Sequence, residues 1–251
     1  MSYPQQKILW KKFDVDRLSV SEIKQLDTGA KICSVLYNHE ELGLVRPVIQ
    51  SPPKMVSKFG LDIFQQDGGT QKWNLGISFD GMDDNESILG FFNLMVSLDN
   101  KIKQFARDNC KEWFKKNKIS DEVIDDKYSS LVKYSRDKST GEIIEKYKPT
   151  YRVQIIQSGK SKTEVFDKKK ESMPLEETLS TKGLKVKCLF SLSCVWLNQG
   201  FGLSLKCNTI EAQKSDRIAG YSFVEDSDDS DGDGDGDEEE GEDGDGAEDD
   251  A

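Results

Sequence analysis

Residues 183–210, GLKVKCLFSLSCVWLNQGFGLSLKCNTI, decide the fold of this 251-residue chain. Apolar and polar residues alternate from Lys185 to Trp196, as in a β-strand with one face in the core and one in water. The apolar face comprises Val186, Cys188, Phe190, Leu192, Cys194 and Trp196. A second apolar run, 201–210, follows the turn residues 198–200 (NQG). The stretch therefore predicts a long β-hairpin that buries one face, Trp196 included.

Further short β segments are predicted at residues 30–37, 44–49, 71–79, 131–136, 143–147, 150–157 and 163–166. Residues 137–141 (DKSTG) predict a hairpin turn, and the polar residues 167–182 predict a mobile loop. One long helix is predicted over 85–117, because apolar residues recur every three to five positions and acidic residues crowd its start. Short strands with one inserted helix predict a mainly β fold, an OB-like partly closed barrel. A mixed α+β sheet with the helix across one face is the alternative.

The C-terminal residues 225–251 reverse the sign of the whole chain. They hold 17 of its 46 Asp and Glu and none of its 35 Lys and Arg, so residues 1–224 carry about +6 while the full chain carries −11. A segment so charged and so poor in apolar residues cannot form a core, so we expect a folded domain over 1–224 and a disordered acidic tail over 225–251. Nucleic acid is also a polyanion. The tail is therefore expected to compete with it for a basic surface of its own chain.

The cysteines and the apolar segments indicate an intracellular protein. The five cysteines form no C-x-x-C pair and lie mostly in apolar β segments, which predicts buried free thiols in a reducing compartment. The N-terminal residues MSYPQQKILWKK contain no apolar run of signal-peptide length. Residues 188–205 are uncharged, but the predicted turn interrupts them, so we expect a hairpin and no membrane span.

Motifs for catalysis or metal binding are weak. The tail matches the EF-hand loop pattern in two registers, 229–240 and 231–242, which low complexity explains. Residues 159–161 (GKS) lack the strand–loop–helix context of a P-loop. The sole histidine, His39, has no Cys or His at ligand spacing, and we expect it in a surface loop. The acidic residues at 80–86 are accounted for by the start of the predicted helix. We therefore predict a protein that is not an enzyme and uses no cofactor or metal.

Basic and aromatic residues interleave in the second half of the body. Residues 127–187 hold 15 Lys and Arg against 8 Asp and Glu, whereas residues 1–126 have a net charge of −2. The candidate nucleic-acid-binding residues are Lys133, Tyr134, Arg136, Lys146, Tyr147, Lys148, Tyr151, Arg152, Lys185 and Lys187. Cations bind phosphates and rings stack on unpaired bases, so a single strand bound without sequence readout is the predicted ligand. The alternative is a solvated strand face with the tyrosines in the core.

A second basic row follows the predicted helix, at Lys103, Arg107, Lys111 and Lys115. Their spacing of four residues places them on one face of the helix. We expect this face to be solvated, with a contact to the nucleic-acid backbone as the alternative.

This layout resembles that of the OB-fold single-stranded DNA-binding proteins of podophages and of their relatives in large nucleocytoplasmic DNA viruses. The resemblance rests on the β-rich body, the inserted helix, the basic aromatic segment and the acidic tail. Residues 73–92 (WNLGISFDGMDDNESILGFF) and 189–212 (LFSLSCVWLNQGFGLSLKCNTIEA) are most similar to the viral branch. The podophage proteins end in an aromatic residue, whereas this chain ends in Asp249, Asp250 and Ala251. That particular partner contact is therefore not implied.

The resemblance implies coating of single-stranded DNA during replication, and a homodimer. It also implies contact of the tail with replication proteins such as polymerase or helicase–primase and, in a virus, a location in the host cytoplasm or nucleus. The candidate partner-binding and autoinhibitory residues of the tail are Asp237, Glu238, Glu239, Glu240, Asp249 and Asp250.

The sequence thus predicts a non-enzymatic single-stranded DNA-binding protein, autoinhibited by its acidic tail, with no membrane partner. An acidic chaperone for histones or other basic proteins is the alternative, with the tail as its working part. The basic body favours DNA binding, because a chaperone body would more usefully be neutral or acidic. A metal-dependent nuclease using Asp80, Asp83 and Asp84 is the third hypothesis.

Overall fold

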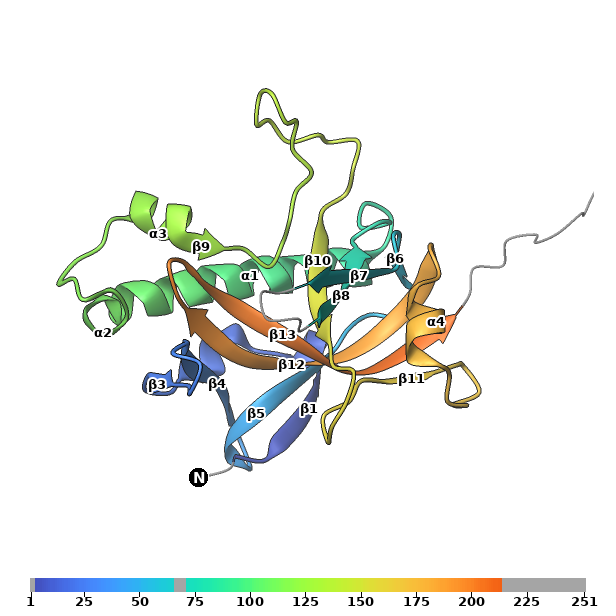
Figure 1. Ribbon diagram of the computed structural model, residues 1–251, viewed down its shortest axis with the longest axis horizontal. Helices are drawn as coiled ribbons and strands as arrows, with labels where there is room; N and C mark the ends of the chain where they lie inside the picture. The colour runs from blue at the N-terminus through green and yellow to red at the C-terminus, as the bar shows by residue number, and fades with distance from the viewer. Residues whose placement is uncertain (1–2, 66–70, 214–251) are drawn as a thin grey trace, which may run out of the picture. The chain divides into compact units, whose positions relative to one another are not determined.

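Two long strands, β12 (Leu184–Leu197) and β13 (Phe201–Gln213), form the hairpin around which the other strands pair (Figure 1). The computed structural model describes residues 3–65 and 71–213. The turn between the strands lies at residues 198–200, as predicted, and the N–H of Asn198 donates to the carbonyl of Gly200 (2.8 Å). The hairpin predicted from the alternating sequence is confirmed.

Five strands close into a barrel. Strand β12 pairs with β6 (Met55–Ser57), β6 with β8 (Gln71–Ser78), β8 with β10 (Thr150–Ile155), and β10 with β13, which returns to β12. The β8–β10 pairing is antiparallel along the whole of β10, whereas a single parallel pairing, Gln154 with Lys206, joins β10 to β13. The prediction of a mainly β, OB-like barrel with one long helix is confirmed.

The remaining strands extend the sheet outside the barrel. Strands β4 (Lys31–His39) and β5 (Gly43–Gln50) pair with each other and with β12. The others are β1 (Gln5–Leu9) on β5, β2 (Leu18–Val20) and β3 (Lys24–Gln25) on β4, β7 (Leu61–Gln65) on β8, and β9 (Tyr128–Ser129) and β11 (Glu164–Phe166) on β13. Two short 3-10 turns, η1 (Trp10–Lys12) and η2 (Val15–Arg17), connect β1 to β2. Six of the strands were not predicted: β1, β2, β3, β6, β7 and β9.

The long helix α1 (Glu86–Asp108) packs its apolar side against the barrel. It begins after Asn85, whose side-chain oxygen accepts hydrogen bonds from the backbone N–H of Ser87 (2.9 Å) and Ile88 (3.3 Å). The buried ring of Phe91 on α1 lies 5.6 Å from Tyr151 and 6.3 Å from Phe190, centroid to centroid. These contacts place α1 over the core.

The predicted helix over 85–117 is wrong at its end. Helix α1 ends at Asp108, Asn109 leaves helical geometry (φ −109°, ψ 23°), and a separate short helix, α2 (Cys110–Phe114), follows. The side chain of Asn109 donates to the carbonyl of Phe105 (2.8 Å). Asn favours such local bonds to the backbone over a continuing helix, which explains the break.

The predicted core face of β12 is also wrong at its C-terminal end. The register of β12 against β13 shifts between Leu192 and Cys194, so a β-bulge interrupts the alternation. Beyond it Val195 and Leu197 are buried, while Cys194 and Trp196 are only half-buried. Because side chains alternate between faces, one extra residue moves every following side chain to the opposite face.

Part of the predicted mobile loop 167–182 is ordered. It contains helix α4 (Leu175–Leu179), in which Thr178 and Leu179 are buried. Gly60, in the left-handed region at φ 75°, lies against this helix, and a Cβ there would be 2.7 Å from the carbonyl oxygen of Ser180. The burial of Leu179 in the common core explains why the segment is fixed.

The predicted free thiols are confirmed: Cys33, Cys110, Cys188 and Cys207 are buried and Cys194 is half-buried, none in a disulfide. None of the helices in residues 3–65 and 71–213 has the length and apolar character needed to cross a membrane.

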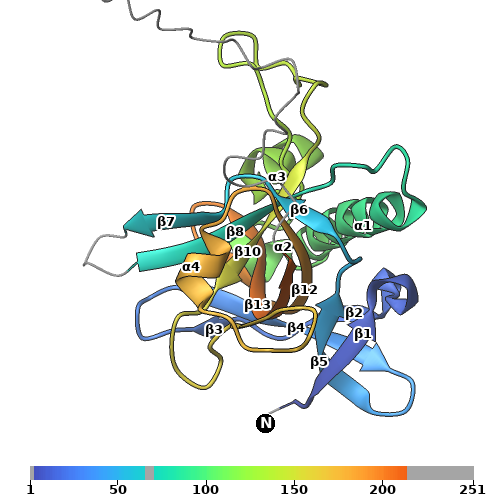
Figure 2. The ribbon, with the colours of Figure 1, turned by 90° about the vertical axis from the view of Figure 1, so that its right-hand side faces the viewer.

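Residues 130–149 form an extension that we call the arm. It projects away from the barrel between β9 and β10 in both views (Figures 1 and 2). The predicted strands 131–136 and 143–147 are not formed there, and only two isolated pairings, Lys133 with Thr150 and Arg136 with Ile143, connect its two sides. The predicted turn at 137–141 is confirmed by a bond from the N–H of Gly141 to the carbonyl of Asp137 (3.0 Å).

The root of the arm is attached to α1 by the buried carboxylate of Asp99. This carboxylate accepts hydrogen bonds from the Tyr128 hydroxyl (2.7 Å), from the backbone N–H of Leu131 (2.7 Å) and Val132 (3.3 Å), and from the Ser130 hydroxyl. Burial, and then the adjacent Asp99 charge, raise the pKa of Tyr128 far above its usual range, so its hydroxyl keeps the proton it donates. Helix α3 (Asp121–Lys127) lies just before this anchor.

The chain divides into one compact unit over Met1–Ser215 and a second unit over Asp216–Ala251. The second unit lies outside the described residues. The acidic tail, its two EF-hand-like registers and its candidate partner-binding residues therefore remain predictions.

We expect Asp99→Ala to destabilise the fold by about 3 kcal/mol, because two buried backbone N–H groups and two hydroxyls lose their shared acceptor. Urea unfolding followed by circular dichroism measures the change. Asp108→Ala, at an exposed position of the same helix, is the matched control and should change stability by less than about 0.5 kcal/mol. Equal effects of the two substitutions would contradict the anchoring role.

Candidate nucleic-acid interface

Strand alternation gives β8 and β10 a polar outer face over a buried inner one. Trp73, Leu75, Ile77, Tyr151 and Val153 point into the core. The outer positions are Lys72, Asn74 and Gly76 of β8 and Arg152 and Gln154 of β10. The antiparallel register sets Gly76 opposite Arg152 and Asn74 opposite Gln154. Adjacent outer positions therefore combine cations with carboxamides.

A hollow of about 280 Å³ opens on this face, and we call it the β8–β10 hollow. It is lined by Lys72, Asn74, Ser129, Ser130, Leu131, Lys133, Arg152, Gln154, Trp196, Leu203, Ser204 and Leu205. Three cations and no acidic side chain are among these residues. The bulge in β12 turns the Trp196 indole toward the hollow. Cations, an indole and polar groups around one concavity fit a ligand that has both a charged and a flat apolar part.

A second groove adjoins the hollow, and Arg152 lines both. The groove runs past Phe59, Asp62, Gly76 and Thr150. Phe59 is 79% exposed and Phe64, on the neighbouring strand β7, is 44% exposed. The guanidinium carbon of Arg152 lies 5.9 Å from the centroid of the Phe64 ring, and its Nη2 lies 3.7 Å from an oxygen of Asp62. Exposed rings thus flank the cation that joins the two depressions.

Positive charge is concentrated where the arm meets β10. The Lys133 ammonium donates to the Ser129 hydroxyl (3.3 Å). Burial lowers the pKa of Lys133, the Asp99 carboxylate offsets part of that shift, and the charge of Arg152 lowers it further. A phosphate between Lys133 and Arg152 would relieve their repulsion and accept charge-assisted hydrogen bonds from both.

The structure brings only part of the predicted binding set together. Lys133 and Arg152 line the β8–β10 hollow. Tyr134, Arg136, Lys146 and Tyr147 are exposed on the arm, and Lys148, at its base, forms an ion pair with Asp83. Lys185 and Lys187 lie on the first half of β12, which pairs with β6 and β5, and Lys187 forms an ion pair with Glu211 (2.6 Å). These two lysines do not line the hollow.

The predicted stacking role of Tyr151 is wrong. Its side chain is 0% exposed and lies among the rings of Phe79, Phe91 and Phe190. Position 151 alternates with the outward positions 150 and 152, so a basic outer neighbour does not make this tyrosine accessible. For Tyr151, the alternative of a core residue holds.

Sequence reasoning missed Phe59, Phe64, Asn74 and Trp196. Phe59 and Phe64 lie in segments without a strong strand pattern. Trp196 was predicted to lie in the core because the alternation of apolar and polar residues along 185–196 gives no indication of the bulge. The WNLGIS segment did carry a signal for Asn74: an amide at an outer position between the buried Trp73 and Leu75.

Two residues of the basic row on the helix form ion pairs within the fold. Lys103 pairs with Asp125 (2.8 Å) and Arg107 with Asp121 (2.7 Å), so these two residues attach α3 to α1.

Among the acidic residues considered for a nuclease, Asp80 pairs with Lys58 (2.7 Å). In the described part of the chain, no group of three or more His, Cys, Asp or Glu side chains is placed to hold a metal.

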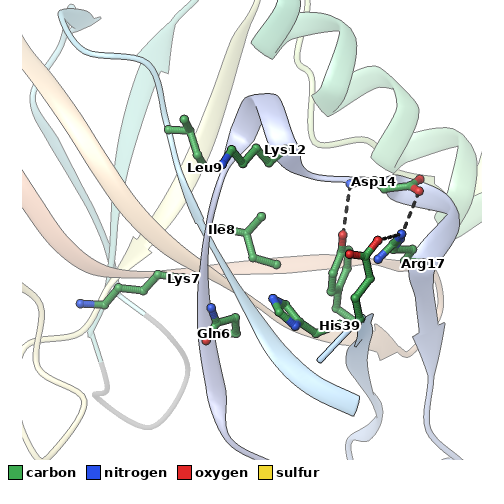
Figure 3. Close-up of a pocket in the computed structure, with 10 residues that line it drawn as sticks. Gln6, Lys7, Ile8, Leu9, Lys12, Asp14, Arg17 and His39 are labelled. Atoms are coloured by element: carbon green, nitrogen blue, oxygen red, sulfur yellow. Dashed lines mark hydrogen bonds and ion pairs between the residues drawn. The ribbon is translucent and has the colours of Figure 1, made fainter. Parts of the chain in front are cut away.

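Another hollow, of about 390 Å³, lies between β1, η2 and β4 (Figure 3). Its cations Lys7, Lys12 and Arg17 are offset by two carboxylates, both of which pair with Arg17. His39, predicted in a surface loop, lines it at the end of β4, half-buried, and its Nδ1 accepts from the N–H of Glu41 (3.3 Å). A polyanion meets less uncompensated charge here than at the β8–β10 hollow.

Comparison with known proteins gives one family. A family model described as "Family of unknown function (DUF5871)" matches residues 84–225, which include α1, the arm and the β12–β13 hairpin. No curated protein matches the chain.

Among solved structures, the chain is similar to the single-stranded DNA-binding protein of bacteriophage Enc34. The complex with single-stranded DNA has 11% identity and a TM-score of 0.40, covering 79% of this chain and 93% of the phage chain. The C-terminal truncation of that protein has 10% identity and a TM-score of 0.38, covering 81% and 98%. A further structure of that protein has 12% identity and a TM-score of 0.36, covering 84% and 98%. Identity and TM-scores at this level do not establish which residues of the two proteins correspond.

The contrast between buried and exposed tyrosines can be tested directly. Tyr151→Ala should lower the free energy of unfolding by about 3–5 kcal/mol, because it leaves a cavity among packed rings. Tyr147→Ala, at a site 49% exposed on the arm, should change it by less than about 0.5 kcal/mol. Urea unfolding of both variants measures this, and similar stabilities would contradict the core assignment of Tyr151.

Proposed function

We propose that this chain, which belongs to the family of unknown function DUF5871, binds single-stranded DNA across the outer face of β8 and β10. The observation that carries the proposal is the β8–β10 hollow, where Lys72, Lys133 and Arg152 surround the Trp196 indole without an acidic side chain. Cations track the phosphates of a strand, and an accessible indole offers a surface on which a base stacks.

The placement of the rings favours a single strand over a duplex. Trp196 is half-buried at the wall of a hollow, so only a base free of its pairing partner can enter to reach it. Phe59 adds an exposed ring in the adjoining groove, and the exposed ring of Phe64 lies beside Arg152. Stacking contributes about 1–3 kcal/mol per base and requires no particular sequence.

Substitutions of the cations and of the indole in this hollow should weaken DNA binding in different ways. Lys133→Ala with Arg152→Ala should weaken binding to oligo-dT at least tenfold and flatten the dependence of log affinity on log salt by about 0.7 for each lost phosphate contact. Trp196→Ala should weaken binding with little change of salt slope, because stacking releases no counterions. Fluorescence anisotropy across a salt series measures both.

Lys182→Ala, an exposed lysine that lines neither depression, is the matched control and should bind as the unaltered chain does. Duplex DNA of the same length should bind much more weakly than oligo-dT. Equal affinity for duplex, or an unchanged affinity of the double variant, would contradict the proposal.

We further propose that the acidic tail of residues 225–251 competes with DNA for this face and that the protein acts in DNA replication. The tail holds 17 acidic residues and is tethered to a body of about +6, so its local concentration near the cations is high. When DNA displaces it, the tail becomes free to bind replication proteins such as polymerase or helicase–primase. The free thiols support an intracellular location.

Deleting residues 225–251 should raise the affinity for oligo-dT, most at low ionic strength, because salt screens the tail from the cations over about 10 Å at 0.1 M. Replacing the tail by a neutral Gly/Ser segment of equal length separates charge from length and should give the same gain. Anisotropy titrations of the three proteins provide the measurement. An affinity that does not change at low salt would rule out competition by the tail.

The chaperone alternative predicts another result from the same proteins. If the tail binds histones or other basic proteins, its loss should abolish that binding and give no gain for DNA. The three cations of the β8–β10 hollow, whose lining includes no acidic side chain, favour the DNA-binding function.

A further inference from the structure

We propose that the β8–β10 hollow holds one base of the bound strand and prefers adenine, through hydrogen bonds from the side chains of Asn74 and Gln154. This inference rests on the proposed function and adds a base preference to it. The sequence had predicted binding without any readout of the bases.

The two carboxamides are placed side by side at the hollow. Asn74 and Gln154 are directly opposite in the antiparallel register, so their side chains leave the same face about 5 Å apart at Cβ. Asn74 is 91% buried, its relative exposure being 9%, yet it lines the hollow. In residues 3–65 and 71–213, the only fully buried side-chain N or O atom without a hydrogen-bond partner is Oγ of Ser57, so the Asn74 amide is not a buried unsatisfied group. Because Asn74 lines the hollow, its amide is available to a ligand there.

The flat indole of Trp196 forms part of the wall of the hollow. The Trp196 indole lies against Gly202, where an added Cβ would be 2.8 Å from Cζ2 of the ring and 3.0 Å from the carbonyl oxygen of Ser129. Glycine at this position therefore lets the indole lie close to β13. A base that enters the hollow would meet the indole on one side and the amides at its edge.

The cations lie where a sugar–phosphate backbone would leave the hollow. Along β8, Lys72 is two residues from Asn74, and along β10, Arg152 is two residues from Gln154, so both cations share the outer face with the amides. A nucleotide with its base inward and its phosphate outward matches this order. The volume of about 280 Å³ is near the lower limit of ~300 Å³ for small-molecule pockets, which suits one base and not two.

Adenine fits these groups best. A carboxamide presents a donor beside an acceptor, and its best-known partner is the N6–N7 edge of adenine. The two-ring face of adenine also covers more of the indole than a pyrimidine does. Arg152, the kind of side chain that favours guanine, is held toward Asp62 and the Phe64 ring.

The test compares oligo-dT with the same oligonucleotide carrying one central adenine, cytosine or guanine. The unaltered full-length protein should bind the adenine-containing strand about tenfold more tightly than oligo-dT. Asn74→Leu and Gln154→Met keep side-chain size and remove the hydrogen-bonding groups. Each should reduce the ratio of the affinities for the adenine-containing strand and for oligo-dT to about one, with both affinities measured for each variant.

Gln65→Met, at an exposed position of β7 that does not line the hollow, is the matched control and should keep the advantage. If Asn74→Leu fails to fold by circular dichroism, the half-buried Gln154 provides the decisive variant. Binding of oligo-dT without an adenine advantage, or an advantage that persists in Gln154→Met, overturns the base preference and leaves the proposed function standing. No binding of oligo-dT by the unaltered protein overturns both.

Discussion

The β12–β13 hairpin is the constraint on which the rest of the structure depends. Strand β12 pairs with β13 along most of its length and also with β4, β5 and β6, so one strand holds both the barrel and the strands outside it. Its pairing with β13 shifts register at two places, and at the second the extra residue, Ser193, lies on β12. The second shift exposes Trp196 to the outer face. This bulge therefore supplies the ring of the candidate binding surface.

Charge placement favours the β8–β10 face as the site for a polyanion, because no acidic side chain lines its hollow. Many of the cations elsewhere already have partners: Lys103 and Arg107 hold α3, Arg17 pairs with two carboxylates, and Lys187 pairs with Glu211. Lys133 is positioned by the arm, whose root is bonded to the buried Asp99. The anchor and the binding surface are thus linked, since loosening the arm would move a cation away from the hollow.

Prediction from the sequence succeeded where a pattern repeats along one element. The predictions of the hairpin, of helix α1 and of the strands near 30–50, 71–79 and 150–157 rested on local patterns of apolar residues. The structure contains each of these elements. Prediction failed where one residue interrupts a pattern: Asn109 ends α1 and the bulge in β12 reverses Trp196. It also failed on the arm, where the two predicted strands are replaced by two isolated pairings, Lys133 with Thr150 and Arg136 with Ile143.

The sequence by itself determined the class of fold, the opposite charges of body and tail, and two cations of the candidate site, Lys133 and Arg152, because composition and periodicity are properties of the chain alone. Only the tertiary structure decided which side chains share a surface. Asn74, Gln154 and Trp196 come from three strands far apart in sequence, and the register between strands places them at one hollow. Tyr151 and Arg152 are neighbours in sequence, but successive side chains of a strand point to opposite faces of the sheet, so Tyr151 is buried in the core while Arg152 lies on the outer face.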